Sequence, residues 1–278
     1  MTRATILGRN WLLALAATVS VALSSAEAAP PQRVVSINVC TDQLAMLLAA
    51  PGQLQSVSHL SRDPQLSVLA GQAAQLPVNQ AQAEEVFLMK PDLVLAGTFS
   101  SQVTVDLLRR LGLRVEQFAP ARSFDDIETH LRRMGALLGR EEQADAQIAS
   151  MRAGLAAIEK PQHSKTVALY FANSYTSGRG TLIDEAVKLA GLDNIADRAG
   201  VNGPSALPLE MLVMEKPDML ILSANERAPA LAFQNFQHPA LRAIEREAKA
   251  MTLPDNLTVC GGPFSVEAVA RLSEAARD

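Results

Sequence analysis

The residues whose side chains could carry catalysis or bind a metal are few, and their spacing favours neither role. The four histidines, His59, His130, His163 and His238, include no His-Glu-x-x-His pair that would aim two imidazoles at one zinc ion. No Gly-x-Ser-x-Gly segment marks a serine nucleophile. Cys40 and His59 could pair as nucleophile and base, while two cysteines are too few for a metal cluster. We expect a protein that is not an enzyme and holds no cofactor or metal, with catalysis by Cys40 as the alternative.

Polar side chains gather where the expected strands end. Residues 33–39 are rich in β-branched side chains and lead through Asn38 into Cys40, Thr41 and Asp42, at the start of a short helix. Open α/β sheets bind ligands at the carboxyl ends of their strands, so these residues are candidate ligand contacts, although they could merely cap the helix. The other candidates follow later strands: Arg62, Thr98, Phe99, Tyr175, Ser177, Arg179, Asn225, Gly261 and Phe264.

One segment of the chain occurs twice. Glu84 stands seven residues before the proline of Lys90-Pro91-Asp92, and Glu210 stands seven residues before that of Lys216-Pro217-Asp218. In both copies a short helix runs into the turn, and a continuous apolar run leaves it, which is typical of a strand buried on both faces. The two copies, with strands and helices alternating around them, predict an α/β fold of two Rossmann-like lobes with parallel sheets and a ligand cleft between them.

The stretch between the two copies predicts helices that join the lobes. Its composition and apolar periodicity favour helix from Ser123, a plausible N-cap, to Lys160. Gly139 predicts the end of a first helix, and Pro161 ends a second, long helix over residues 140–160. We expect an N-terminal lobe over residues 29–138, a single connecting helix over 139–160 and a C-terminal lobe over 161–278.

The first 28 residues predict export. Two arginines precede an apolar run over residues 11–23, and Ala26-Glu27-Ala28 fits a cleavage site. We therefore expect a signal peptide over residues 1–28 and a periplasmic protein. Its removal lowers the formal net charge from −4 to −5, because two arginines and one glutamate are lost, and this acidity argues against nucleic-acid binding.

The two cysteines follow expected strands in different lobes. Cys40 comes after the strand over residues 33–39, and Cys260 comes after a strand expected over 257–259. Export permits disulfides, so Cys40 and Cys260 could pair across the mouth of the cleft and hinder its opening. Two free thiols are the other possibility.

Taken together, these features resemble the helix-linked periplasmic binding proteins of ABC importers, which capture cobalamin, ferric siderophores and haem. The most specific pieces are residues 33–36, residues 90–94, and Thr176-Ser177-Gly178 ahead of a helix. The resemblance implies a monomer that binds a small-molecule metal chelate between its lobes and delivers it to an ABC permease in the inner membrane. It also implies that one surface glutamate on each lobe, Glu84 and Glu210, docks on arginines of the permease.

The sequence departs from that family at the expected cleft. Members that hold a corrin or a hydroxamate siderophore use several aromatic side chains there, including tryptophan. Removal of the signal peptide takes away Trp11, the only tryptophan, and leaves Tyr170 and Tyr175 as the only tyrosines. We lean only slightly towards an iron chelate over a corrinoid. The alternative is an exported α/β enzyme that uses Cys40 or the cleft loops.

Overall fold

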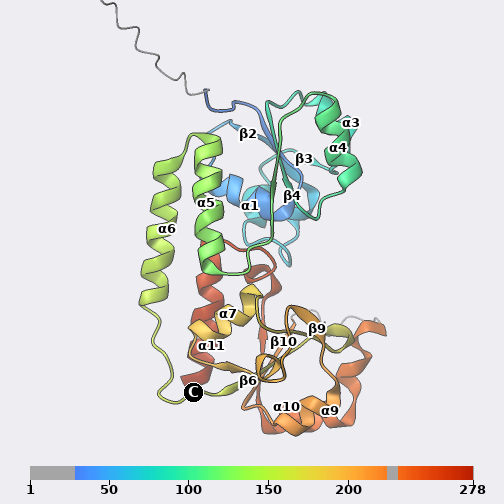
Figure 1. The fold of residues 1–278 in the computed structure, drawn as a ribbon, viewed down its shortest axis with the longest axis vertical. Coiled ribbons are helices and arrows are strands. Elements are labelled where there is room, and N and C mark those ends of the chain that lie inside the picture. Colours follow the sequence, from blue (N-terminus) through green and yellow to red (C-terminus); the bar gives the residue numbers. More distant parts are fainter. Residues whose placement is uncertain (1–28, 224–230, 278) are drawn as a thin grey trace, which may run out of the picture.

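The computed structural model describes residues 29–223 and 231–277, which form two lobes of parallel β-sheet (Figure 1). This confirms the predicted α/β fold. The predicted signal peptide and the candidate contact Asn225 lie outside the described residues. Within the described part of the chain, no helix combines the length and the apolar character that crossing a bilayer requires.

The first lobe is a five-stranded parallel sheet in the order β3-β2-β1-β4-β5. Its strands are β1 (Val34–Ser36), β2 (Leu54–Ser58), β3 (Val78–Asn79), β4 (Leu93–Gly97) and β5 (Val115–Phe118). The helices between them are α1 (Val39–Leu48), α2 (Ala70–Ala73), α3 (Ala83–Leu88) and α4 (Gln102–Arg110). Along β4, Leu93 and Leu95 enter one apolar cluster while Val94 and Ala96 enter another, so both faces of the sheet are covered.

The second lobe has a parallel sheet in the order β11-β10-β6-β8 and a small antiparallel pair, β7 and β9. Its strands are β6 (Thr166–Tyr170), β7 (Tyr175–Ser177), β8 (Asp193–Asn194), β9 (Pro204–Ala206), β10 (Met219–Ser223) and β11 (Lys249–Leu253). Its helices are α7 (Leu182–Leu189), α8 (Ile195–Arg198), α9 (Leu209–Glu215), α10 (Pro239–Glu247) and α11 (Val266–Arg277).

The strand predicted over residues 257–259 is wrong. Leu257 ends a short 3₁₀ turn (Asp255–Leu257). β10 has β6 on one side, and the strand on its other side is β11, which comes earlier in the chain than Leu257. All five residues of β11 pair in parallel register with Met219–Ser223, so the position beside β10 is filled before the chain reaches Leu257. Cys260 therefore lies in a loop beyond that turn, and not directly after a strand.

Two helices, α5 (Phe124–Leu138) and α6 (Glu141–Ala156), lie side by side along one side of the first lobe (Figure 1). The predicted start and break are confirmed, since Ser123 accepts a hydrogen bond from the Asp126 N–H at 3.0 Å and Gly139 adopts φ 66°. Helix α5 packs on α1 of the first lobe, and α6 packs on α11 of the second. The chain thus crosses between the lobes in α6, with α5 alongside it.

Helix α6 ends at Ala156, four residues before the predicted end at Lys160. The reason is a contact with α11. The carbonyl of Glu159 accepts hydrogen bonds from the Ser273 hydroxyl and, at 3.4 Å, from the Arg277 guanidinium, which hold this segment against α11 and away from the helical path.

The duplicated Lys-Pro-Asp turn ties each apolar strand to the strand beside it. Asp92 accepts hydrogen bonds from the backbone N–H groups of Gln32 (2.6 Å) and Arg33 (3.0 Å), just before β1. Asp218 accepts from the N–H of Thr166 at 2.7 Å, at the start of β6. The turns on the two lobes therefore have the same structural role.

Candidate ligand site

A cavity of about 130 Å³ opens where the first lobe meets a loop of the second. On the first-lobe side it is formed by the segments that follow β1, β4 and β5, which is where an open parallel sheet offers its ligand site. On the second-lobe side it is formed by Val259 and Gly261. The lining residues are Asn38, Cys40, Thr41, Leu44, Gly97, Thr98, Phe99, Phe118, Ala119, Pro120, Ala121, His130, Val259 and Gly261.

Asn38 is held at the cavity by its role as the cap of α1. Its Oδ1 accepts hydrogen bonds from the N–H groups of Cys40 (3.1 Å) and Thr41 (3.4 Å). Its side chain lies against Gly97, where an added Cβ atom would stand 2.9 Å from Nδ2. The Oδ1 atom of Asn38 therefore caps the helix, as one of the two predictions for this residue had it. Its Nδ2 group donates no hydrogen bond to any acceptor in the described part of the chain.

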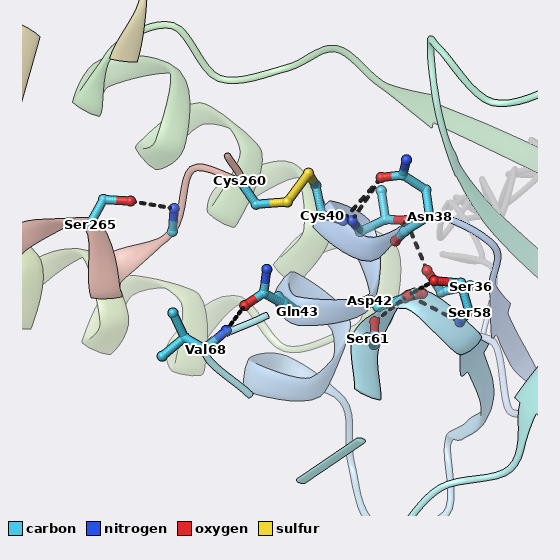
Figure 2. The surroundings of a disulfide bond; sticks show 12 residues. Ser36, Asn38, Cys40, Asp42, Gln43, Ser58, Ser61, Val68, Cys260 and Ser265 are labelled. Atoms are coloured by element: carbon cyan, nitrogen blue, oxygen red, sulfur yellow. Dashed lines mark hydrogen bonds between the residues drawn. A yellow bond between two sulfur atoms is a disulfide. The ribbon is translucent and has the colours of Figure 1, made fainter. Parts of the chain in front are cut away.

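Cys40 lines the cavity, and its disulfide with Cys260 links the lobes (Figure 2). The Cα atoms of the two cysteines are 5.1 Å apart. The next residue, Gly261, packs so closely on α5 that an added Cβ atom would lie 2.8 Å from Cγ1 of Ile127. A loop of the second lobe is thus fixed against the first lobe at this point.

Two hydrogen bonds join the lobes near the disulfide. Asn256 donates from Nδ2 to the carbonyl of Pro64 at 2.7 Å, and the Phe124 N–H donates to Oε2 of Glu185 on α7 at 2.7 Å. Partial burial raises the pKa of Glu185, although the bond from Phe124 opposes that rise. Because each of these contacts is a single hydrogen bond, we expect both to break more easily than the disulfide.

His130 brings an imidazole from α5 to the cavity. Its ring meets the edge of Phe118 with the ring centroids 5.6 Å apart, and the Arg133 guanidinium lies 4.3 Å from the centroid of Phe118. Burial is the main cause that lowers the pKa of His130, with Arg133 adding to the effect and Asp126 opposing it. This shift favours the neutral imidazole, which has a lone pair with which to accept a hydrogen bond or bind a metal.

Asp42 lies beneath the cavity and does not line it. The residue is fully buried, and its Oδ2 accepts hydrogen bonds from the backbone N–H of Ser58 at 3.0 Å and from the hydroxyls of Ser58 and Ser61 (Figure 2). Burial raises the pKa of Asp42 to about 6, against the effect of these hydrogen bonds. The predicted contact between Asp42 and a ligand is therefore absent from this conformation, and Asp42 instead ties α1 to β2.

Several other predicted contacts also lie away from the cavity. Arg62 donates to the carbonyls of Ala73 (3.4 Å) and Leu76 (2.7 Å), and thereby holds the loop around α2. Arg179 is paired with Asp197 at 2.6 Å. Both guanidinium groups already have partners in the fold, which is why neither reaches into the cavity.

The remaining predicted contacts divide between the two lobes. Thr98 and Phe99 line the cavity with Asn38, and Phe99 is 85% exposed there. Tyr175 and Ser177 belong to β7, where they pair with β9, and they do not line the cavity. Phe264 folds back over Gly262, away from it.

The cavity is also lined by residues that were not predicted as contacts: Phe118, Pro120, His130 and Val259. Phe118 ends β5, so the rule that ligands bind at the carboxyl ends of strands indicates Phe118 and Pro120 once that strand is recognised. His130 follows Ile127 by one helical turn, but the sequence does not say that this end of the helix faces a cavity. Val259 was assigned to the strand that does not exist.

Comparison with known proteins places the chain in a family. A family model described as periplasmic binding protein matches residues 34–248. The chain therefore belongs to the periplasmic binding protein family. A cobalamin-binding protein of Halobacterium salinarum is 32% identical over 203 residues, covering 69% of this chain and 53% of that protein, so the chain spans about half the length of this relative.

Two other proteins align over most of the chain. An uncharacterised ABC transporter substrate-binding lipoprotein of Bacillus subtilis is 24% identical, with 88% of this chain and 80% of that protein covered. A periplasmic haem-binding protein of Pseudomonas aeruginosa is 25% identical, with 89% of this chain and 93% of that chain covered and a TM-score of 0.71. The two-lobe fold is therefore shared along nearly the whole described chain.

Proposed function

We propose that this chain is the solute-binding component of an ABC importer, and that it captures a metal chelate and delivers it to an inner-membrane permease. Membership of the periplasmic binding protein family and the cavity between the lobes support this together. We further propose that cleavage after Ala28 releases the chain into the periplasm as a monomer without catalytic activity. The lobes would then comprise residues 29–138 and 161–278, with residues 139–160 connecting them.

The cavity carries the proposal because its lining is mostly apolar with a few fixed polar groups, as ligand pockets usually are. The exposed ring of Phe99 offers a face to a planar macrocycle, and Asn38 offers an amide N–H. The neutral imidazole of His130 is a candidate ligand for the metal of the chelate. Candidates for the chelate are cobalamin, haem and ferric siderophores, and the relative at 32% identity supports a corrinoid.

The volume of the cavity implies that the lobes separate to admit such a ligand. About 130 Å³ is below the roughly 300–1,000 Å³ of typical small-molecule pockets. We propose that the lobes part at the two hydrogen bonds of Asn256 and Glu185 while the disulfide holds one side. Ligand entry would then require the two hydrogen bonds to break, but it would not require the disulfide to break.

A thermal-shift screen of the mature protein tests the ligand class. Cobalamin, cobinamide, haem and several ferric siderophores would each be added in excess, because a ligand at 100 times its dissociation constant stabilises the fold by ~2.7 kcal/mol. One clear stabiliser is expected. A folded protein that none of these compounds stabilises would contradict the chelate assignment.

Variants then test the site. Phe99→Ala should weaken binding of the stabilising chelate, whereas Leu60→Ala, which removes an exposed apolar side chain elsewhere on the first lobe, should not. His130→Ala should change the visible absorption spectrum of the bound chelate if the imidazole reaches the metal. Equal affinity of the Phe99 and Leu60 variants would place the ligand outside this cavity.

The enzyme alternative rests on Cys40 as a nucleophile. The sulfur of Cys40 is bonded to Cys260, so it offers no thiolate in this state. The test measures hydrolysis of thiol-reactive esters by the oxidised and the reduced protein. The enzyme alternative would be supported only if the protein hydrolysed the esters and Cys40→Ser abolished that activity.

Docking on the permease is assigned to Glu84 and Glu210, as the family resemblance implies. Both carboxylates are exposed and lie near the starts of equivalent helices, α3 and α9. We propose that each carboxylate meets an arginine of the permease.

A further inference from the structure

The two copies of the repeated segment agree in exposure as well as in sequence. From Glu84 to Asp92 and from Glu210 to Asp218, buried, half-buried and exposed residues follow one another in the same order. The five exposed positions hold a glutamate, two apolar residues, a lysine and an aspartate in both copies. Each lobe therefore presents the same chemistry on its surface.

The fold explains the buried residues and the aspartates of the repeat, but not its exposed apolar pair. Val86 and Leu212, which are equivalent, are buried in the cores of their lobes. The aspartates bind the backbone before the neighbouring strands, as described above. The apolar residues have no such role: Leu88 is 77% exposed and its equivalent, Met214, is 69% exposed. Positions of a helix that face water usually carry polar side chains.

The exposed apolar residues lie on the same helix face as the glutamate. Leu88 follows Glu84 by four residues, and Met214 follows Glu210 by four, a spacing that places side chains next to one another. Phe87 and Val213 precede them by one residue, and each is 42% exposed. Both helices lie on the side of the molecule away from α5 and α6 (Figure 1).

We infer that these residues form paired docking faces, Glu84, Phe87 and Leu88 on the first lobe and Glu210, Val213 and Met214 on the second. The inference rests on the proposed function and adds a second element to the glutamate contacts. The partner it fits is a permease with two equivalent surfaces, each with a cationic side chain next to an apolar hollow. A feature duplicated on both lobes fits a partner that presents its receiving site twice.

The two elements have different effects on binding kinetics. The glutamates attract the cationic groups over a distance, which raises the association rate and is screened by salt. The apolar pairs act only in contact, where their removal from water slows dissociation at any ionic strength. The permease complex should therefore respond to substitution of the two elements in distinguishable ways.

The test measures binding of the full mature protein to its permease in lipid nanodiscs by surface plasmon resonance at low and high salt. In the Leu88→Ser/Met214→Ser variant, dissociation should be about tenfold faster at both salt concentrations, with the association rate within about twofold of the wild type. In the Glu84→Gln/Glu210→Gln variant, association should slow, mainly at low salt. Leu60→Ser is the control for loss of an exposed apolar side chain.

Each other outcome has one meaning. If the apolar variant behaves like Leu60→Ser while the glutamate variant associates slowly, docking relies on charge alone and the paired docking faces are refuted. If the wild type binds a chelate but not the permease, proposed docking itself fails while the ligand site stands. Sedimentation velocity should show a monomer; a dimer that the apolar variant abolishes would assign the faces to a second copy and overturn the inference.

Discussion

The carboxyl of Asp42 should make the stability of this protein depend on pH in an unusual direction. Burial raises its pKa in the folded protein from 3.8 to about 6. The folded state therefore binds a proton more tightly than the unfolded chain does. The stability that Asp42 contributes is full below pH 3.8 and is lost as the pH rises through about 6.

The size of the effect follows from the shift. A difference of about two pKa units between the folded and unfolded states corresponds to ~3 kcal/mol in the free energy of unfolding. Of this, about 2 kcal/mol should appear between pH 7.5 and pH 4.5, since the unfolded carboxyl is still largely ionised at the lower value. Asp42→Asn removes the titrating group and retains an oxygen that can accept hydrogen bonds from Ser58 and Ser61.

Urea unfolding of the wild type and of Asp42→Asn across this pH range measures the effect. As the pH falls from 7.5 to 4.5, the free energy of unfolding of the wild type should rise by about 2 kcal/mol relative to that of Asp42→Asn. The difference between the two proteins is used because other carboxylates also titrate: the guanidinium of Arg152 lowers the pKa of Glu128, which acts in the opposite direction, while burial raises the pKa of Glu185, which acts in the same direction. A difference that stays constant with pH would show that Asp42 does not titrate in this range, and would refute the reasoning.

Three further predictions concern stability. Cys40→Ser/Cys260→Ser should lose about 5 kcal/mol, because a disulfide across 220 residues strongly restricts the unfolded chain, and reductant should lower the guanidinium midpoint of the wild type but not of this variant. Glu128→Gln, which weakens the ion pair between α5 and α6, should lower the urea midpoint only slightly, because the Arg152 side chain is largely exposed and water screens the pair. Gly178→Ala should lower the melting temperature, because the new methyl group would overlap the carbonyl oxygen of Val201; the control is Gly71→Ala, whose added methyl group meets no neighbouring atom and whose backbone φ is not positive.

The sequence was enough to predict the lobes because their signals are local. The apolar runs after Pro91 and Pro217, the N-cap at Ser123 and the break at Gly139 each depend on a few adjacent residues. The prediction failed where distant partners decide the structure. Residues 257–259 are too few and too mixed in character to identify a strand, and the register of β10 with β11 assigns that place elsewhere.

The same limit applies to the candidate site. Asn38, Thr98 and Phe99 were predicted at the cavity because they follow strands, and they line it. Arg179 also follows a strand, but it pairs with Asp197, eighteen residues away, a choice that the sequence does not reveal. Asp42 could have faced either the cavity or the sheet, since a residue in the first turn of a helix has both options.

The disulfide sets an order on the maturation of the chain. Cys40 leaves the ribosome 220 residues before Cys260, which at roughly 5–20 residues per second is a wait of about 10 to 45 seconds. During that interval the first lobe can fold, but its only cysteine has no correct partner within the chain. In this period the thiolate of Cys40 can attack the disulfide of another protein, which forms a mixed disulfide and releases the second sulfur of that protein as a thiolate. A chain truncated before Cys260 would also lack Gly261 of the cavity lining and all of α11, which packs on α6 and α7, and it would leave Cys40 as a free thiol.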